Sequence, residues 1–203
     1  MNRNILAILR GIKPNEVLEI SQVIANSGIN YIEVALNSPD AFESIRLLRK
    51  KFSGHIQIGA GTVTKIGEVL ALSRLNVDFI VSPNFDPEVV KATKEANIIS
   101  YPGVTTASEC FSAINCGADG LKFFPASLLG IENFKALKAI LPKDIPFYMV
   151  GGVGPDNFSD WIDAGAYGFG IGSSLYKSGD SIEIVENNSS SIVISYDEAK
   201  NDH

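Results

Sequence analysis

Short apolar segments, rich in β-branched and aromatic residues, recur along the whole chain and are separated by stretches of a different periodicity. Such segments are typical of buried β-strands. The stretches between them place apolar residues three and four apart, the spacing of a helix, as at Val17, Ile20 and Ile24. Strand and helix are therefore predicted to alternate along the chain. The predicted strands are residues 5–9, 31–35, 56–60, 79–82, 98–101, 121–124, 147–150 and 168–172.

Eight strand–helix units of about twenty to twenty-five residues each predict one α/β domain over residues 1–203, a parallel (β/α)8 or TIM barrel. An open, doubly wound sheet is the alternative, and no linker or shift in composition indicates a second domain. The segment at about residues 180–200 stays open between helix and loop. Its apolar residues share one helical face, but the run NNSSS at residues 187–191 is a poor helix former.

Charge and hydropathy exclude several classes of partner. The net charge is −6 and the basic residues are scattered, whereas proteins that bind nucleic acid carry clustered basic faces. No apolar stretch is long enough to span a bilayer, and the N-terminal apolar run is too short for a signal peptide. We therefore expect a cytoplasmic protein that binds neither nucleic acid nor membrane.

The sequence also gives no sign of a metal site. The two histidines, His55 and His203, and the two cysteines, Cys110 and Cys116, form no cluster with metal-ligand spacing. The cysteines lie six apart on one predicted helix, so we interpret them as free thiols. We expect no metal and no cofactor, which leaves the chemistry to organic side chains.

Two charged residues interrupt predicted strands, Lys122 in GLKFF and Glu33 in YIEVAL. Alternate strand residues face the interior of a closed barrel, so both groups could meet there. One interpretation is a buried ion pair that holds the strands in register, although such pairs contribute little net stability. The other is that burial lowers the pKa of Lys122, whose neutral amine then forms a Schiff base with a substrate carbonyl. Glu33 would move the protons of a retro-aldol cleavage.

Polar and glycine residues follow the other predicted strands, at the barrel end where active sites lie. Gly-Gly after the seventh strand and Gly-Ser-Ser, at residues 172–174, after the eighth indicate a phosphate site, while tight turns are the alternative for each. Arg10 and Thr62 could hold a substrate carboxylate. An ordinary surface arginine and a helix N-cap are the respective alternatives. A sugar-phosphate isomerase or epimerase and a non-catalytic phospho-ligand sensor also fit these residues.

The motifs ILAILRGI, IEVALNSP, IGAGTV, VSPN, YPGVTTASE, GLKFFPA, VGGVGPDN and GIGSSLY, taken together, resemble those of the 2-keto-3-deoxy-6-phosphoaldonate aldolases, class I enzymes with a (β/α)8 fold. The resemblance covers nearly the whole chain. It implies that Lys122 forms the Schiff base, that Glu33 is the acid–base residue, and that pyruvate and glyceraldehyde 3-phosphate are products of a small phosphorylated 2-keto-3-deoxy sugar acid. It also implies a homotrimer. The implied substrate-binding residues are Arg10, Thr62, Phe124, Val150, Gly151, Gly152, Val153, Gly172 and Ser173.

Two positions separate the branches of this family. The phosphogluconate branch commonly has an arginine four residues after the acid–base glutamate and a threonine before the Gly-Gly pair, where this chain has Asn37 and Val150. Both differences, together with RGI, LNSP and WIDAGA, look like the 2-dehydro-3-deoxy-6-phosphogalactonate branch, which implies the galactonate epimer as substrate, with the gluconate epimer as the alternative. The absence of a hydroxyl at position 150 removes a hydrogen bond that would favour one epimer, so specificity should shift or relax.

Overall fold

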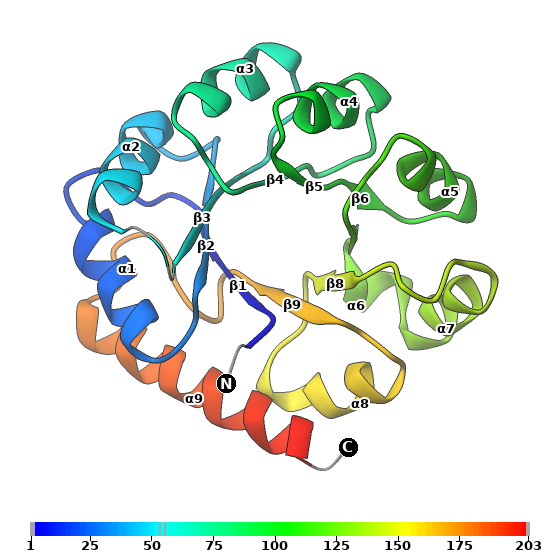
Figure 1. Ribbon diagram of the computed structural model, residues 1–203. Helices are drawn as coiled ribbons and strands as arrows, with labels where there is room; N and C mark the ends of the chain where they lie inside the picture. The colour runs from blue at the N-terminus through cyan, green and yellow to red at the C-terminus, as the bar shows by residue number, and fades with distance from the viewer. Residues whose placement is uncertain (1–2, 53, 55, 202–203) are drawn as a thin grey trace.

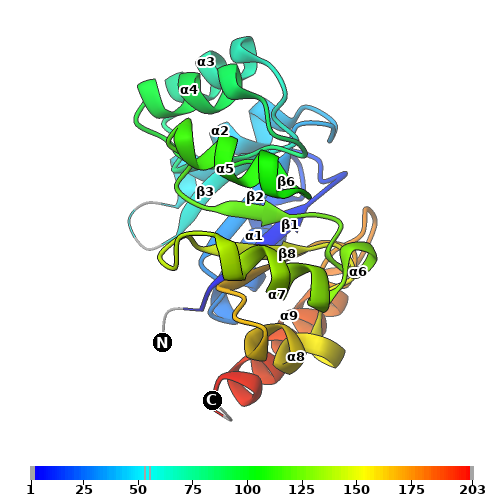
Figure 2. The ribbon, with the colours of Figure 1, turned by 90° about the vertical axis from the view of Figure 1, so that its right-hand side faces the viewer.

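The computed structural model describes residues 3–52, 54 and 56–201. Its strands form a ring around which the helices are arranged, as Figure 1 shows along the barrel axis and Figure 2 from the side. The strands are β1 (Ile5–Leu9), β2 (Tyr31–Ala35), β3 (Gln57–Gly61), β4 (Phe79–Val81), β5 (Ile99–Tyr101), β6 (Gly103–Val104), β7 (Leu121–Phe123), β8 (Phe147–Val150) and β9 (Gly168–Ile171). The helices are α1 (Val17–Asn26), α2 (Ala41–Lys51), α3 (Ile66–Arg74), α4 (Pro87–Glu95), α5 (Ala107–Asn115), α6 (Ala126–Leu129), α7 (Ile131–Ile140), α8 (Phe158–Asp163) and α9 (Ile182–Asn201), with the 3₁₀ turn η1 (Pro155–Asn157) before α8.

The predicted (β/α)8 barrel is confirmed, with one strand divided in two. Neighbouring strands pair in parallel in the order β5-β4-β3-β2-β1-β9-β8-β7-β6. The two strands at the ends of this order, β5 and β6, are joined by Pro102 alone, so they are two parts of the fifth barrel strand. Proline has no N–H to give to the ladder, which accounts for the interruption. The predicted bounds of the other strands differ from the observed ones by at most one residue.

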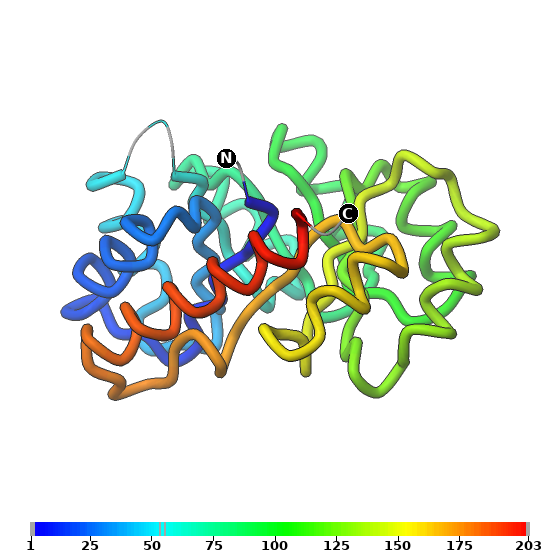
Figure 3. The backbone as a smooth tube through the Cα atoms, turned by 90° about the horizontal axis from the view of Figure 1, so that it is seen from below, coloured from blue at the N-terminus to red at the C-terminus, as the bar shows by residue number. Residues whose placement is uncertain are grey.

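The segment whose structure the sequence left open is the long helix α9, which lies against α1 and α8 (Figure 3). Its buried face includes Val185, Ile192 and Tyr196. The run NNSSS is helical despite its low propensity, because packing of this face outweighs the intrinsic preference. Ser189 in that run is buried, and its hydroxyl donates a hydrogen bond of 2.7 Å to the carbonyl of Val185.

The interior of the barrel holds a small aromatic cluster, separate from the larger core between strands and helices. The rings of Tyr31, Phe79, Tyr101 and Tyr148 follow one another with centroid distances of 6.2, 6.2 and 5.0 Å, and Leu6 packs with them. We call these five residues the aromatic floor. Because strand residues alternate between two faces, the next inward-facing positions along the strands lie in a layer closer to the C-terminal end of the barrel.

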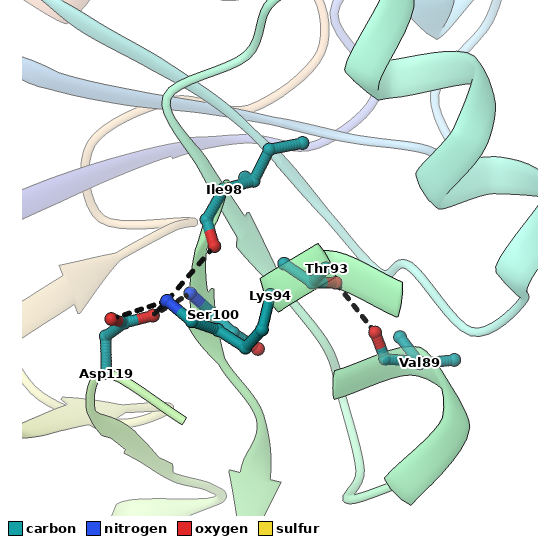
Figure 4. A network of polar contacts seen from close by, with 6 residues as sticks. All are labelled: Val89, Thr93, Lys94, Ile98, Ser100 and Asp119. Atoms are coloured by element: carbon teal, nitrogen blue, oxygen red, sulfur yellow. Dashed lines mark hydrogen bonds and ion pairs between the residues drawn. The ribbon is translucent and has the colours of Figure 1, made fainter. Parts of the chain in front are cut away.

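Carboxylates placed just before two strands tie neighbouring units together. Asp119, two residues before β7, accepts hydrogen bonds from the backbone N–H of Ser100 (2.8 Å) and from Lys94 Nζ of α4 (2.7 Å), as Figure 4 shows. In the same way Asp78, before β4, accepts from the N–H of Ile58 (2.7 Å) and from Arg49 of α2 (2.5 Å). Each carboxylate thus joins a helix, the strand that follows it and the next strand around the barrel.

The Asp119 network generates a stability prediction. Asp119→Ala should lower the free energy of unfolding by about 1–3 kcal/mol, because it leaves the N–H of the buried Ser100 without its acceptor. Urea unfolding at neutral pH measures the change. Lys91→Ala is the control, since it breaks only the exposed pair with Glu88 and should change stability by less than about 0.5 kcal/mol. Equal stabilities of the two variants would contradict the role given to Asp119.

Candidate active site

Lys122 and Glu33 lie in the layer above the aromatic floor. Lys122 comes from the centre of β7, where its neighbours Leu121 and Phe123 pack outward into the main core. Glu33 comes from the centre of β2, paired in register with Ile8 of β1. Both are buried, at 5% and 1% exposure respectively. The barrel therefore places an amine and a carboxyl group in its interior from strands that are not adjacent in the sheet.

Burial dominates the electrostatics of both groups. It lowers the pKa of Lys122, an effect that the carboxylate of Glu33 opposes and the guanidinium of Arg10 strengthens. It raises the pKa of Glu33, against the attraction of Lys122 and Arg10. Each group is thus shifted toward its neutral form. Glu33 Oε2 makes no hydrogen bond within the described part of the chain, so this buried oxygen is free to meet a substrate hydroxyl or amine.

Gly61 at the end of β3 explains how the Glu33 carboxyl group finds room. A β-carbon at position 61 would lie 1.7 Å from Glu33 Oε1 and 2.4 Å from its carboxyl carbon. The carboxyl group therefore rests directly on the backbone of β3. The backbone after β2 is tied to β3 as well, because the N–H of Leu36 donates a hydrogen bond of 2.8 Å to the carbonyl oxygen of Gly61. A side chain at position 61 would have to displace the carboxyl group.

A cavity of about 600 Å³ opens at the C-terminal ends of β1, β8 and β9. It meets the buried amine at Phe124, which lines the cavity and whose ring centroid lies 4.8 Å from Lys122 Nζ. It approaches Glu33 through Ile8, the register partner of that residue. The predicted site residues that line the cavity are Arg10, Phe124, Val150, Gly151, Gly152, Val153, Gly172 and Ser173.

The glycines after β8 have backbone conformations that favour glycine. Gly151 and Gly152 have φ values of +88° and +74°, in the left-handed region. A β-carbon on Gly152 would come within 2.4 Å of the Ser127 side chain, and Ser127 donates its N–H to the Gly151 carbonyl at 3.0 Å. The loop after β8 is therefore packed closely on the start of α6. Its path across the cavity is possible because Gly151 and Gly152 have no side chains.

Thr62 is the predicted substrate-binding residue that does not line this cavity. It is half-buried, follows Gly61 and has a φ of +61°. Its alternative interpretation as a helix N-cap is wrong, because α3 begins four residues later, at Ile66, with Lys65 at the N-cap. The chain needs the intervening residues Val63 and Thr64 to turn from β3 onto α3.

Other residues at the cavity were missed in the sequence. They belong mainly to the loop after β9, and a lysine between hydroxyl residues in the segment SLYKS was the available signal. Strand alternation also places Ile8 and Gly170 on the inner face, so the wall beside Val150 could have been assigned. The additional lining residues are Ile8, Gly170, Tyr176, Lys177 and Ser178, while Ser174, of the Gly-Ser-Ser motif, lines the cavity as well.

The two cysteines do not line this cavity. Cys110 is buried and Cys116 half-buried, both are free, and burial raises the pKa of Cys110 to about 11. His55 and His203 fall outside the described residues. Among the residues described, no group of His, Cys, Asp or Glu could hold a metal ion. A search of the same residues for a helix that could cross a membrane finds none.

The chain is similar to known aldolases along nearly its whole length. The family model of the KDPG and KHG aldolases matches residues 1–193. The 2-dehydro-3-deoxy-6-phosphogalactonate aldolase of Escherichia coli (strain K12) is 42% identical over 195 residues, covering 96% of this chain and 95% of that protein. A probable enzyme of the same name from Rhizobium meliloti (strain 1021) is 41% identical over 197 residues, covering 97% and 93%. A solved structure described as native KDPGal matches with a TM-score of 0.97 and 41% identity, covering 99% of this chain and 98% of that one.

The buried carboxyl group generates a prediction about stability and pH. A raised pKa in the folded state means that the contribution of Glu33 to stability is complete below its unfolded pKa of about 4.3 and is lost as pH rises through the folded value. Glu33→Gln has no carboxyl group to ionise, so its stability does not fall with pH for this reason. Its free energy of unfolding relative to the unaltered protein should therefore rise with pH above about 4.3.

The attraction between the ionised Glu33 and Lys122 opposes this effect, because it lowers the pKa of Glu33. Burial is the larger influence on Glu33, so the predicted direction of the difference is kept. Urea unfolding at a series of pH values measures the slope. Glu132→Gln, at an exposed carboxylate, is the matched control and should follow the unaltered protein. A flat difference between Glu33→Gln and the unaltered protein would argue against the raised pKa.

Proposed function

The chain belongs to the KDPG and KHG aldolase family, and from that membership we propose that it cleaves 2-dehydro-3-deoxy-6-phosphogalactonate to pyruvate and D-glyceraldehyde 3-phosphate. It is an aldolase, a carbon–carbon lyase of a metal-independent family. The observation that carries the proposed mechanism is the buried Lys122, whose pKa is lowered, in one barrel layer with Glu33 and next to the cavity. Isomerase, epimerase and sensor functions are not retained, since family membership favours none of them.

Lys122 supplies the amine that forms the imine. Its neutral form attacks the C2 carbonyl of the substrate, and loss of water from the carbinolamine leaves a protonated imine. The imine withdraws electrons, so the C3–C4 bond breaks and its electron pair remains as an enamine. Glyceraldehyde 3-phosphate then leaves. Protonation of the enamine at C3, followed by addition of water to the imine carbon, releases pyruvate and restores Lys122.

Glu33 moves the protons that these steps require. It accepts the proton of the C4 hydroxyl as the C3–C4 bond breaks, and it serves the hydroxyl of the carbinolamine at the imine stages. Its raised pKa suits both roles, because burial shifts the carboxyl group toward its neutral form, so that it can donate a proton as well as accept one. The unpartnered Oε2 supports this assignment.

The two ends of the substrate are bound by different groups. Arg10 and Thr62 hold the carboxylate beside the imine, and Phe124 packs against the pyruvyl part. The phosphate lies at the far end of the cavity, where backbone N–H groups and a hydroxyl meet it. A volume of about 600 Å³ suits a ligand of this size. The residues proposed to bind the phosphate are Gly151, Gly152, Val153, Gly172 and Ser173.

Val150 supports the galactonate epimer as substrate over the gluconate epimer. It lines the cavity, and a β-carbon on Gly170 would lie 2.7 Å from its Cγ2, so these residues form one closely packed wall. Asn37, the other position that separates the branches, is exposed and does not line the cavity. The wall at Val150 therefore carries the argument for the epimer.

Covalent trapping tests the mechanism. Treatment with pyruvate and sodium borohydride should reduce the imine and add the mass of the reduced pyruvyl group to Lys122, because burial lowers the pKa of this amine and favours its neutral, nucleophilic form. Peptide mass spectrometry locates the adduct. Borohydride without pyruvate is the first control, and Lys122→Arg is the second. Folded protein with an unmodified Lys122 would contradict the proposed mechanism.

A substitution at the wall tests the choice of epimer. Val150→Thr adds a hydroxyl with little change of volume, and it should raise the ratio of kcat/KM for the gluconate epimer to that for the galactonate epimer by about ten-fold. Coupled assays of both epimers measure the ratio. Val193→Thr makes the same exchange on α9, and its ratio should equal that of the unaltered protein. A Val150→Thr ratio that does not change would remove this wall from the recognition of C4.

The proposed function includes an oligomeric state and a cellular location. We propose a homotrimer, which accords with the exposed apolar side chains Ile66 and Leu70 on α3 and Phe111 on α5. Sedimentation velocity on the purified protein gives the mass of the assembly relative to the 21.8 kDa chain. The proposed cytoplasmic location follows from the class of substrate, and cell fractionation tests it.

A further inference from the structure

Arg10 lies between two backbone groups that one side chain holds. The N–H of Gly11 donates a hydrogen bond of 2.8 Å to the hydroxyl oxygen of Ser38. The same hydroxyl donates to the carbonyl of Leu9 at 3.4 Å. A serine hydroxyl can donate once and accept twice, so these two bonds are compatible. Ser38 thus fixes the residue before Arg10 and the residue after it.

Ser38 is itself held firmly. It is 8% exposed, and its N–H donates a hydrogen bond of 2.9 Å to the carbonyl oxygen of Ala35 at the end of β2. The following Pro39 restricts the backbone of Ser38 as well. Since β2 also carries Glu33, the hydroxyl of Ser38 connects the loop that bears Arg10 to the strand that bears the buried carboxyl group.

The rest of the Arg10 loop is held from its other side. Tyr176 donates its hydroxyl hydrogen to Glu16 Oε1 at 3.1 Å, and the N–H of Lys13 donates to the same oxygen at 3.0 Å. Gly11 has a φ of +83°, which turns the chain sharply after Arg10. These contacts shape the loop, but Ser38 is the side chain whose hydrogen bonds reach both neighbours of Arg10.

We propose that Ser38 is a positioning residue that aims the Arg10 guanidinium at the substrate carboxylate. The motifs RGI and LNSP would then be the two halves of one structural unit, joined by the Ser38 hydroxyl. This inference rests on the proposed function, because it acts through the carboxylate-binding role of Arg10. Asn37 and Pro39 shape the turn that presents Ser38, which gives the LNSP motif a purpose although Asn37 itself does not reach the cavity.

Ser38→Ala removes the hydroxyl and should weaken binding of the carboxylate without changing the chemical step. We expect the pyruvate concentration for half-maximal borohydride trapping, and the KM for the sugar acid, to rise about ten-fold while kcat stays within about two-fold. Acetone, which lacks the carboxylate but also forms an imine, should be trapped on Lys122 at the same half-maximal concentration in both proteins. A general loss of packing would weaken both ligands equally.

The chain offers a matched control in Ser44. This serine is also buried, at 0% exposure, but its hydroxyl has no hydrogen-bond partner within the described residues. Ser44→Ala should therefore leave both trapping curves unchanged. Ser38→Thr, which restores a hydroxyl, should recover most of the affinity for pyruvate. Where Ser38→Ala does not fold, Ser38→Cys replaces it and should show the same selective loss.

A double-mutant cycle tests whether Ser38 acts through Arg10. In an Arg10→Gln background, Ser38→Ala should cause no further loss of pyruvate affinity, because there is no guanidinium left to aim. Additive losses would overturn the proposal, as would equal losses for pyruvate and acetone, or a Ser38→Ala that behaves like Ser44→Ala. A wild-type protein that forms no adduct with pyruvate would instead overturn the proposed function, and this inference with it.

Discussion

The structure depends on the burial of one amine and one carboxyl group in the interior of the barrel. Lys122 and Glu33 are both withdrawn from solvent, and Glu33 Oε2 has no hydrogen-bond partner among the described residues. Desolvation therefore outweighs their mutual attraction and shifts both pKa values toward the neutral forms. Such an arrangement adds little to stability, as buried ion pairs in general do. Its value lies in the chemistry proposed for it, which needs a nucleophilic amine and a carboxyl group that can carry protons.

Two glycines on β3 make room in the barrel interior for large side chains of the neighbouring strands. Gly61 has no side chain where the Glu33 carboxyl group lies, and Gly59 has none where the ring of Phe79 lies, since a β-carbon there would be 2.3 Å from the ring. The aromatic floor closes the barrel beneath the two groups. The motif IGAG is thus a requirement of packing in the barrel interior: large side chains on one strand are matched by glycines on the next.

The binding groups stand on loops, and their positions are set by contacts between loops. Arg10 depends on Ser38 from the loop after β2, and the glycines after β8 depend on Ser127 at the start of α6. Farther from the cavity, Asp78 and Asp119 join α2 and α4, respectively, to the strands beside them. The barrel interior thus holds the groups proposed for the chemistry, while hydrogen bonds and close packing between loops arrange the groups proposed to select the substrate.

The sequence by itself determined the alternation of strands and helices, because hydrophobic periodicity is a local property that each segment displays independently. It also marked Lys122 and Glu33, since a charge within an apolar strand is costly enough to require a reason. It could not show that Pro102 divides the fifth strand, that the NNSSS run is helical, or that Thr62 is not a helix cap. Those outcomes depend on pairing and packing with distant segments. Only the tertiary structure brought Ser38 to Arg10 and the Tyr176–Ser178 loop to the cavity, because the meeting of side chains from separate loops is decided by strand register and barrel closure.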